Sequence, residues 1–237
     1  MKDIVKIVND YVAVWNEADA AERRRRIRSV WLPDGTTCFR LLDAHGYDAI
    51  EQRVTGSWEK WLSEAKYVFR PKGFAHHHDA IKLEFVMVRL PGGEVEANGL
   101  SFLLLDAEGK IRHDYQFNPS ANDATELTDR YVTILSEPDS NIRRRRIEEL
   151  WAPACRFASE TASRSGLNDI ASEFEQFHGS GGRAFSSANL SQAHHNLAWI
   201  KWQMRSADGE TIDARTDLLI LDDDERIRVD YQFREAA

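Results

Sequence analysis

Few features of this sequence suggest a disulfide-rich, low-complexity or membrane-embedded protein. Its 237 residues include only 2 Cys, 13 Gly and 6 Pro, too few for a disulfide scaffold or a fibrous chain. Cys38 and Cys155 are not spaced as a metal or redox pair, so we expect buried thiols. No apolar run approaches the roughly 18 residues of a membrane span, and Asp3 and Asp10 interrupt the pattern that a secretion signal requires. We expect a globular cytoplasmic protein without a membrane partner.

Surplus positive charge is also missing. The formal net charge is -8, whereas affinity for nucleic acid depends on an excess of Lys and Arg that neutralises phosphates. Two arginine quartets, at residues 23–26 and 143–146, resemble nucleic-acid patches. On a helix, however, successive residues are rotated by about 100° around the axis, and Glu22 and Glu148 lie nearby. We therefore predict solvated or salt-bridged surface arginines and no nucleic-acid partner.

An internal repeat organises the chain. The matching segments occur in the same order in both halves, and their spacing shortens only where loops are expected. We predict two homologous domains, residues 1–118 and 119–237. The matches are YV at residues 11–12 and 131–132, RRRRI at 23–27 and 143–147, HHD or HHN at 77–79 and 194–196, and DYQF at 114–117 and 230–233.

Each half begins with a helical pattern. Apolar residues recur at helical spacing within residues 4–15 and 127–134. Asp19 and Asp139 are placed to cap a second helix, whose apolar side we expect to include Trp31 in the first copy. A third helix follows Gly46 and Gly166. Each apolar stripe requires a surface on which to pack.

Period-2 patterns supply that surface. Turn-forming residues at 92–93 and 107–109 separate strands that we expect to be antiparallel. We predict the α+β class, with two tandem cone-shaped α+β barrels in which three helices pack on a curved antiparallel sheet. In the first copy, residues 74–90 alternate so that one strand face carries His77, Asp79, Ile81, Leu83, Phe85 and Met87.

Several segments resemble one protein family. YVAVWNEAD, WLPD at residues 31–34, HHD, and LDAEGKI before the last strand are similar to the nuclear transport factor 2-like superfamily, above all its SnoaL-like (polyketide cyclase-like) branch. The resemblance implies the cone fold but no single activity, because the superfamily includes isomerases, dehydratases, cyclases, hydrolases and non-catalytic proteins. Members commonly pair through the outer faces of their sheets, so the resemblance implies an internal pseudo-dimer. Leu197 and Trp199 make the expected outer face of one strand apolar.

Similarity to ketosteroid isomerase implies specific site residues. Its tyrosine on the first helix matches Tyr11 and Tyr131, and its second oxyanion donor matches Ser101 and Asp217. Its carboxylate base would fall at residues 39–41 and 157–159, where no side chain can abstract a proton at neutral pH. The resemblance therefore implies that Tyr131 and Asp217 could polarise a carbonyl, without a base to complete a steroid isomerase.

His77, Asp79 and Tyr11 form the one acid–base set that the sequence offers. Residues i and i+2 of a strand share a face, so Asp79 would raise the basicity of the imidazole within an apolar hollow. The alternative is a structural role, in which His77 bonds a main-chain carbonyl or Asp79. Asn196 replaces the acid in the second copy and weakens a role for His194. Consecutive histidines at residues 76–78 cannot converge on one ion, so neither a metal nor a cofactor is predicted.

The aromatic residues could line a ligand-binding hollow or simply fill the core. The leading hypothesis is a protein that holds a small, mostly apolar organic molecule, with cofactor-free dehydratase, isomerase or cyclase chemistry based on His77. The alternative is a non-catalytic ligand-binding or interaction module. The segment GSGGR at residues 179–183 precedes a strand, so a flexible loop is preferred to an anion site. The candidate lining residues are Trp15, Trp31, Phe85, Tyr115 and Phe117 in the first copy, and Trp151, Trp202, Tyr231 and Phe233 in the second.

Overall fold

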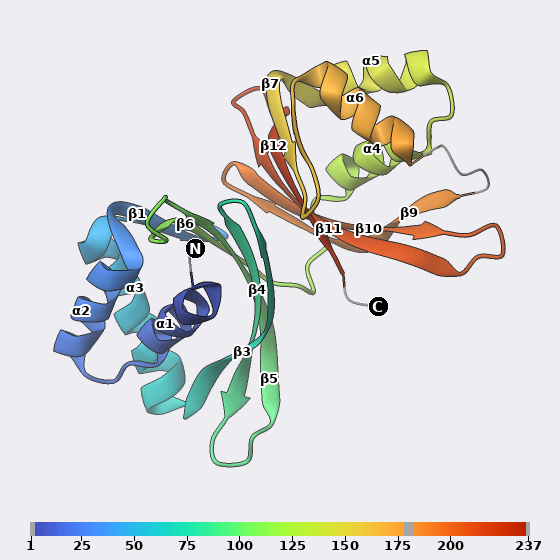
Figure 1. The fold of residues 1–237 in the computed structure, drawn as a ribbon. Coiled ribbons are helices and arrows are strands. Elements are labelled where there is room, and N and C mark those ends of the chain that lie inside the picture. Colours follow the sequence, from blue (N-terminus) through green and yellow to red (C-terminus); the bar gives the residue numbers. More distant parts are fainter. Residues whose placement is uncertain (1–2, 178–182, 236–237) are drawn as a thin grey trace. The chain divides into compact units, whose positions relative to one another are not determined.

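The computed structural model describes residues 3–177 and 183–235. The chain divides into two compact units, residues 1–119 and 120–237, one residue beyond the expected boundary. Each unit is an α+β domain whose helices lie against one face of a six-stranded sheet (Figure 1), which confirms the predicted fold class. Within the described ranges, no helix has the length and apolarity needed to cross a bilayer.

The two units share one order of elements, and the first adds a π-helical segment, η1, after its third helix. The first unit comprises α1 (Ile4–Asn16), α2 (Ala20–Val30), β1 (Trp31–Phe39), β2 (Leu42–His45), α3 (Gly46–Ser57), η1 (Trp58–Glu64), β3 (Tyr67–His77), β4 (Ala80–Arg89), β5 (Val95–Leu105) and β6 (Ile111–Phe117). The second comprises α4 (Thr125–Ser136), α5 (Ser140–Leu150), β7 (Trp151–Ala158), β8 (Ser163–Ser165), α6 (Leu167–Gln176), β9 (Ala184–His194), β10 (Leu197–Arg205), β11 (Thr211–Leu221) and β12 (Ile227–Arg234).

Each sheet combines antiparallel pairs with one parallel pair. The strand orders are β2-β1-β6-β5-β4-β3 and β8-β7-β12-β11-β10-β9. The pairs β1–β6 and β7–β12 are parallel, so the expectation of a wholly antiparallel sheet is wrong at one pair in each unit. Trp31, expected on the second helix, is instead the first residue of β1. An apolar pattern identifies a strand but not its neighbour, and only the fold brings the last strand beside the first.

The helices pack through the apolar stripes that the sequence predicts. In α1 the buried residues include Val8, Tyr11 and Trp15. The carboxylate of Asp19 accepts the Glu22 N–H at 2.8 Å and caps α2, as expected. These stripes join inward-facing residues of the sheet in one core, whose members include Ile27, Trp31, Ile81, Leu83, Leu103 and Ile111.

One arginine of each quartet is buried, which corrects the prediction of four surface arginines. Arg23 and Arg143 are 3% and 4% exposed. The Arg23 guanidinium donates to the Glu17 carbonyl at 2.7 Å, and Arg143 donates to the Glu137 carbonyl at 2.6 Å. Each arginine thereby satisfies a carbonyl in the turn between the first two helices of its unit. The neighbouring Arg24 pairs with a glutamate at the surface, as expected.

The second sheet has an apolar outer face. Ala198 and Ile200 belong to the core on the helix side, so the alternation of β10 places Leu197 and Trp199 on the opposite side. This agrees with the expected apolar outer strand. Pairing of the two sheets into a pseudo-dimer stays a prediction.

Removal of a helix cap will destabilise its unit. We expect Asp19→Ala and Asp139→Ala each to lower the free energy of unfolding by about 1 kcal/mol, because the N–H groups at the start of α2 or α5 lose a carboxylate acceptor. Urea denaturation measures this change. Asp19→Asn keeps an acceptor oxygen and should stay within a few tenths of wild type. An Asp19→Ala protein as stable as Asp19→Asn would contradict the assignment.

Candidate functional site

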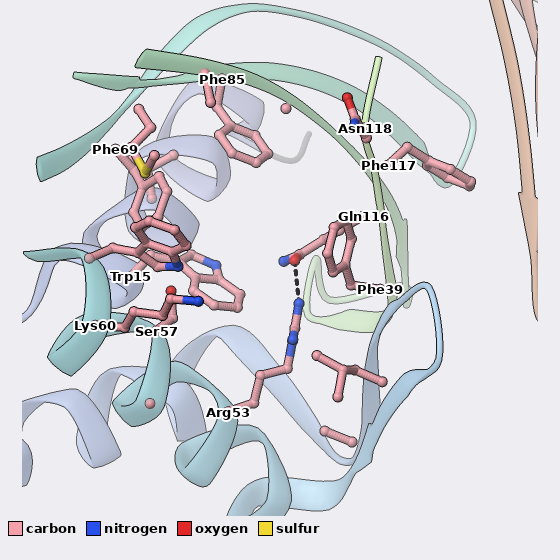
Figure 2. A pocket seen from close by; sticks show the side chains of 18 of the residues that line it. Trp15, Phe39, Arg53, Ser57, Lys60, Phe69, Phe85, Gln116, Phe117 and Asn118 are labelled. Carbon is pink, nitrogen blue, oxygen red and sulfur yellow. Dashed lines mark hydrogen bonds between the residues drawn. The ribbon is translucent and has the colours of Figure 1, made fainter. Parts of the chain in front are cut away.

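The first unit contains a cavity of about 800 Å³. It lies between the helices α1, α3 and η1 on one side and the inner face of the sheet on the other (Figure 2). Most of its lining is aromatic or aliphatic. The lining residues are Tyr11, Val12, Trp15, Phe39, Leu42, Asp43, Ala44, Ala49, Gln52, Arg53, Gly56, Ser57, Lys60, Trp61, Phe69, Phe85, Met87, Ala97, Asn98, Gly99, Gln116, Phe117 and Asn118.

Three aromatic rings form one wall of the cavity. Trp15 and Phe69 meet edge to face with centroids 6.5 Å apart, and Phe69 meets Phe85 in the same way at 6.0 Å. The Phe85 ring lies directly over Gly99, its partner on β5. A Cβ atom at Gly99 would stand 2.1 Å from the ring, so only glycine permits this ring position. The wall is therefore specified by an aromatic–glycine pair across two strands.

A buried polar network closes the cavity behind Tyr11 and Gln116. The Tyr11 hydroxyl donates to Asp114 Oδ2 at 3.0 Å, and Thr37 donates to the same oxygen at 2.9 Å. Gln116 Nε2 donates to both the Tyr11 oxygen and Asp114 Oδ2 at 3.1 Å. Ser101 Oγ lies 2.9 Å from the Tyr11 oxygen and donates to it, because the single proton of Tyr11 is directed to Asp114. Asp114 is thus the acceptor at the centre of the network.

Burial controls the ionisation of this network. Desolvation raises the pKa of Asp114 from 3.8 to about 6, although its hydrogen-bond donors and Arg53 oppose the rise. Desolvation and the charge of Asp114 also raise the pKa of Tyr11 well above 10.0. Tyr11 therefore keeps its proton at neutral pH and directs it toward Asp114. Its hydroxyl is engaged within the protein and is not directed at a ligand carbonyl.

Arg53 brings a positive charge to the cavity from α3. Its guanidinium lies 5.6 Å from the Trp15 ring centroid and 5.9 Å from that of Phe39. Nη2 donates to Gln116 Oε1 at 2.6 Å (Figure 2). The sequence prediction did not include Arg53. The sequence feature that could have identified it is the position of Arg53 three residues after Ile50 and one before Val54, beside the buried stripe of α3.

A carboxylate that the sequence analysis missed also lines the cavity. Asp43 on β2 accepts a hydrogen bond from the Cys38 thiol, with a sulfur–oxygen distance of 3.2 Å, and its other oxygen lies 2.8 Å from His45 Nε2. Residues 39–41, where the resemblance placed a base, end just before it. Burial raises the pKa of the Cys38 thiol to about 12, so this cysteine is a hydrogen-bond donor and not a nucleophile.

The structure corrects the placement of His77 and Asp79. The expected strand over residues 74–90 is interrupted by a turn at His78 and Asp79, and His77 pairs with Ala80 across the hairpin. Directly paired residues point to the same side. Since Ile81 faces the core, Ala80 and His77 face the outer side, away from the cavity. His194 pairs with Leu197 in the same way, so neither histidine is placed to act on a molecule in a hollow.

The aromatic candidates divide between the cavity and the core. Trp15 and Phe85 line the cavity, and Phe117 borders it with its ring turned away (Figure 2). Trp31 is fully buried beside Tyr11. Tyr115 alternates with the inward-facing Asp114 and lies on the outer face. The same alternation puts Tyr231 and Phe233 outside, whereas Trp151 packs in the core. Residues 178–182, which include most of the GSGGR segment, lie outside the described residues.

The second unit repeats the network with a second carboxylate. Tyr131 donates to Asp230 Oδ2 at 2.8 Å, and Trp202 donates its indole N–H to Asp217. Asp217 stands where the first unit has Ser101. Desolvation raises the pKa of Asp217 to about 7, and desolvation together with the charge of Asp217 raises that of Asp230 well above 3.8. At neutral pH the two carboxyl groups therefore share a proton instead of both being ionised.

Large side chains occupy the hollow of the second unit. By the repeat, Phe177 corresponds to Ser57 and Trp202 to Phe85. The rings of Phe177 and Trp202 lie 5.9 Å apart, and each lies within 6.2 Å of Phe185. Phe177 and Trp202 are thus larger than their counterparts Ser57 and Phe85, which line the cavity of the first unit.

Comparison with known proteins gives likenesses of fold. No family model and no curated protein matches the chain. Solved structures similar to it include a SnoaL-like family protein from Agrobacterium tumefaciens (24% identity, TM-score 0.45, covering 47% of this chain and 97% of its own). A candidate polyketide cyclase from Sinorhizobium meliloti (16%, 0.38, 47% and 94%) and a candidate ketosteroid isomerase from Kribbella flavida (15%, 0.38, 47% and 77%) are similar too. Each covers about half of this chain.

Replacement of Asp217 by serine, the residue of the first unit, will change the pH dependence of stability. The folded-state pKa of Asp217 is raised, so its stabilising protonation is fully present below pH 3.8 and is lost as pH rises through about 7. Between pH 5 and pH 8, the free energy of unfolding of the wild type should fall by about 2 to 3 kcal/mol more than that of Asp217→Ser. Urea denaturation at both pH values measures the difference.

The matched control is Asp223→Ser, at an exposed turn position. It should follow the wild-type pH dependence. If Asp217→Ser also followed wild type between pH 5 and pH 8, the shared-proton assignment for Asp217 and Asp230 would be wrong.

Proposed function

We propose that the first unit binds a small, mostly apolar organic molecule and that the second unit has a structural role. The observation that carries this proposal is the cavity of about 800 Å³ with its aromatic wall. Ligand pockets for small molecules span roughly 300 to 1,000 Å³ and combine apolar walls with a few fixed polar groups. The first unit offers that combination, with Arg53 and Gln116 as the fixed polar groups.

The difference between the two units supports this division of labour. A protein interior normally packs to high density, and in the second unit the rings of Phe177, Phe185 and Trp202 contact one another. The first unit has Ser57 and Phe85 at two of these positions and keeps an opening. The apolar walls of this open cavity are not fully removed from water and therefore contribute less stability than a packed core. A bound ligand would offset that difference.

Filling the cavity will remove ligand binding without unfolding the protein. Ser57→Phe combined with Phe85→Trp introduces the two side chains of the second unit, so the added volume should occupy the cavity as it does there. We expect loss of the small molecules that copurify with wild type, measured by native mass spectrometry, while the melting temperature remains within a few degrees of wild type or rises.

The matched control is Phe177→Ser, the reverse exchange in the second unit. It should lower stability by about 1 to 2 kcal/mol, because Phe177 is a half-buried ring packed against the core, and leave the copurified molecules unchanged. Retention of the same molecules by the filled double variant would contradict the proposal, since the cavity would then not hold them.

Acid–base catalysis is the second candidate function, and the observation that favours it is Asp43. Its carboxylate lines the cavity and contacts His45, which can exchange protons with solvent because its side chain is 67% exposed. A base beside an apolar ligand could remove a proton from an activated carbon. The buried Tyr11 and Asp114 would support the structure of the site, not the transfer.

This candidate predicts hydrogen–deuterium exchange at a carbon atom of the copurified molecule in D2O. Wild type should catalyse the exchange, and Asp43→Asn should slow it at least a hundredfold while the molecule still binds. NMR of the isolated compound follows the exchange. Binding without exchange in wild type would reject catalysis by Asp43 and leave the binding proposal in place.

A further inference from the structure

Arg53 is an interior cation without an interior carboxylate partner. Among the described residues, no carboxylate oxygen lies within salt-bridge distance of Arg53, and its buried Nε–H has no acceptor. Arg24 and Arg25, on the surface of α2, each pair with a glutamate. Among the residues that the structure places, Arg53 makes one hydrogen bond, to a neutral amide oxygen, Gln116 Oε1. Four of its five N–H groups therefore have no acceptor among the described residues, and of these the Nε–H is shielded from solvent.

The aromatic rings beside Arg53 strengthen its preference for an anion. A guanidinium between the Trp15 and Phe39 rings is held in place and is partly shielded from water. An ion pair gains energy in such a site, because less water competes for the charge. The flat faces of the same rings suit a planar apolar body.

The other charged groups of the cavity leave a positive balance. Lys60 also lines it, with Nζ 4.5 Å from the Trp61 ring centroid. Asp43 is the one carboxylate in the lining within residues 3–177 and 183–235, and both of its oxygens are engaged by Cys38 and His45. Asp114 lies behind the lining, where three donors satisfy one of its oxygens. The cavity thus presents two cationic side chains, Arg53 and Lys60, and one carboxylate, Asp43, that is already hydrogen-bonded within the protein.

Gln116 fixes the orientation of the site. Its Nε2 donates to Tyr11 and Asp114, so its Oε1 must face Arg53. The guanidinium is held at the end of the cavity by this one acceptor. In the second unit, Glu173 stands at the position of Arg53 and pairs with Arg164, so the free cation is specific to the unit that has the cavity.

We propose that the molecule held by the first unit is an organic anion, a planar apolar body whose carboxylate pairs with Arg53. This inference rests on the proposed binding function and adds the charge of the ligand. Arg53 is the residue that determines specificity, and the aromatic wall of Trp15, Phe69 and Phe85 receives the apolar part. A carboxylate can pair with the two Nη groups at the end of the guanidinium in the bidentate geometry that arginine favours.

Two probes of equal shape and different charge test the inference. Isothermal titration of the full-length protein with 2-naphthoate and with 2-naphthamide at pH 7.5 compares an anion with its neutral counterpart. We expect wild type to bind the acid at least tenfold more tightly than the amide. Arg53→Met should lower the affinity for the acid at least tenfold and change that for the amide less than twofold. Arg53→Lys, which keeps the charge but not the bidentate geometry, should give an intermediate result.

The control is Arg24→Met, which removes the same charge from the surface and should leave both affinities unchanged. Equal affinity of wild type for acid and amide would overturn the assignment of an anionic ligand while the binding function stood, and this comparison needs no variant to fold. An equal loss of both probes in Arg53→Met would overturn the role of its charge. If neither probe bound to wild type, the proposed binding function would itself be contradicted.

Discussion

A buried hydrogen bond between a tyrosine and an aspartate holds each unit together. Tyr11 on α1 donates to Asp114 on β6, and Tyr131 on α4 donates to Asp230 on β12. Each bond joins the first helix of its unit to the last strand. The other helices and strands of the unit lie between these two elements in the sequence. A carboxylate in this position is costly to bury, and it is tolerated because several donors converge on it. Everything that lines the hollow is placed relative to this bond.

The two units solve the cost of that aspartate differently. In the first, Asp114 is surrounded by neutral donors, and the nearest cation, Arg53, acts through Gln116. In the second, Asp217 replaces a serine and must share a proton with Asp230. Trp202 supplies an indole N–H to Asp217 and at the same time fills the hollow. The extra carboxylate and the bulky donor therefore belong together, as parts of a packed core.

The sequence was sufficient to predict the repeat, the helices and their caps, and the inward face of Ile81, Leu83 and Phe85. It was insufficient for the face of His77. The sequence shows the same alternation whether residues 78–79 continue the strand or form a two-residue turn. With the turn, His77 pairs with Ala80 and lies on the face opposite to Ile81. A related ambiguity explains why Tyr115 was expected to line the hollow. The sheet carries apolar residues on both faces, and alternation alone does not say which face packs against the helices.

The charged residues of the cavity were harder to predict for a different reason. Arg53 and Asp43 lie on different elements, and neither belongs to a recognisable sequence motif. They come together only because α3 and β2 border the same cavity. A helical arginine normally reaches solvent or a carboxylate, and the chain contains many that do. What sets Arg53 apart is that no carboxylate among the described residues lies within salt-bridge distance of it, and Asp114 is reached only through Gln116. In a duplicated chain, one copy can supply most of the stability. The other copy can then retain an open interior with an unbalanced charge, which in a single domain would lower the stability of the whole protein.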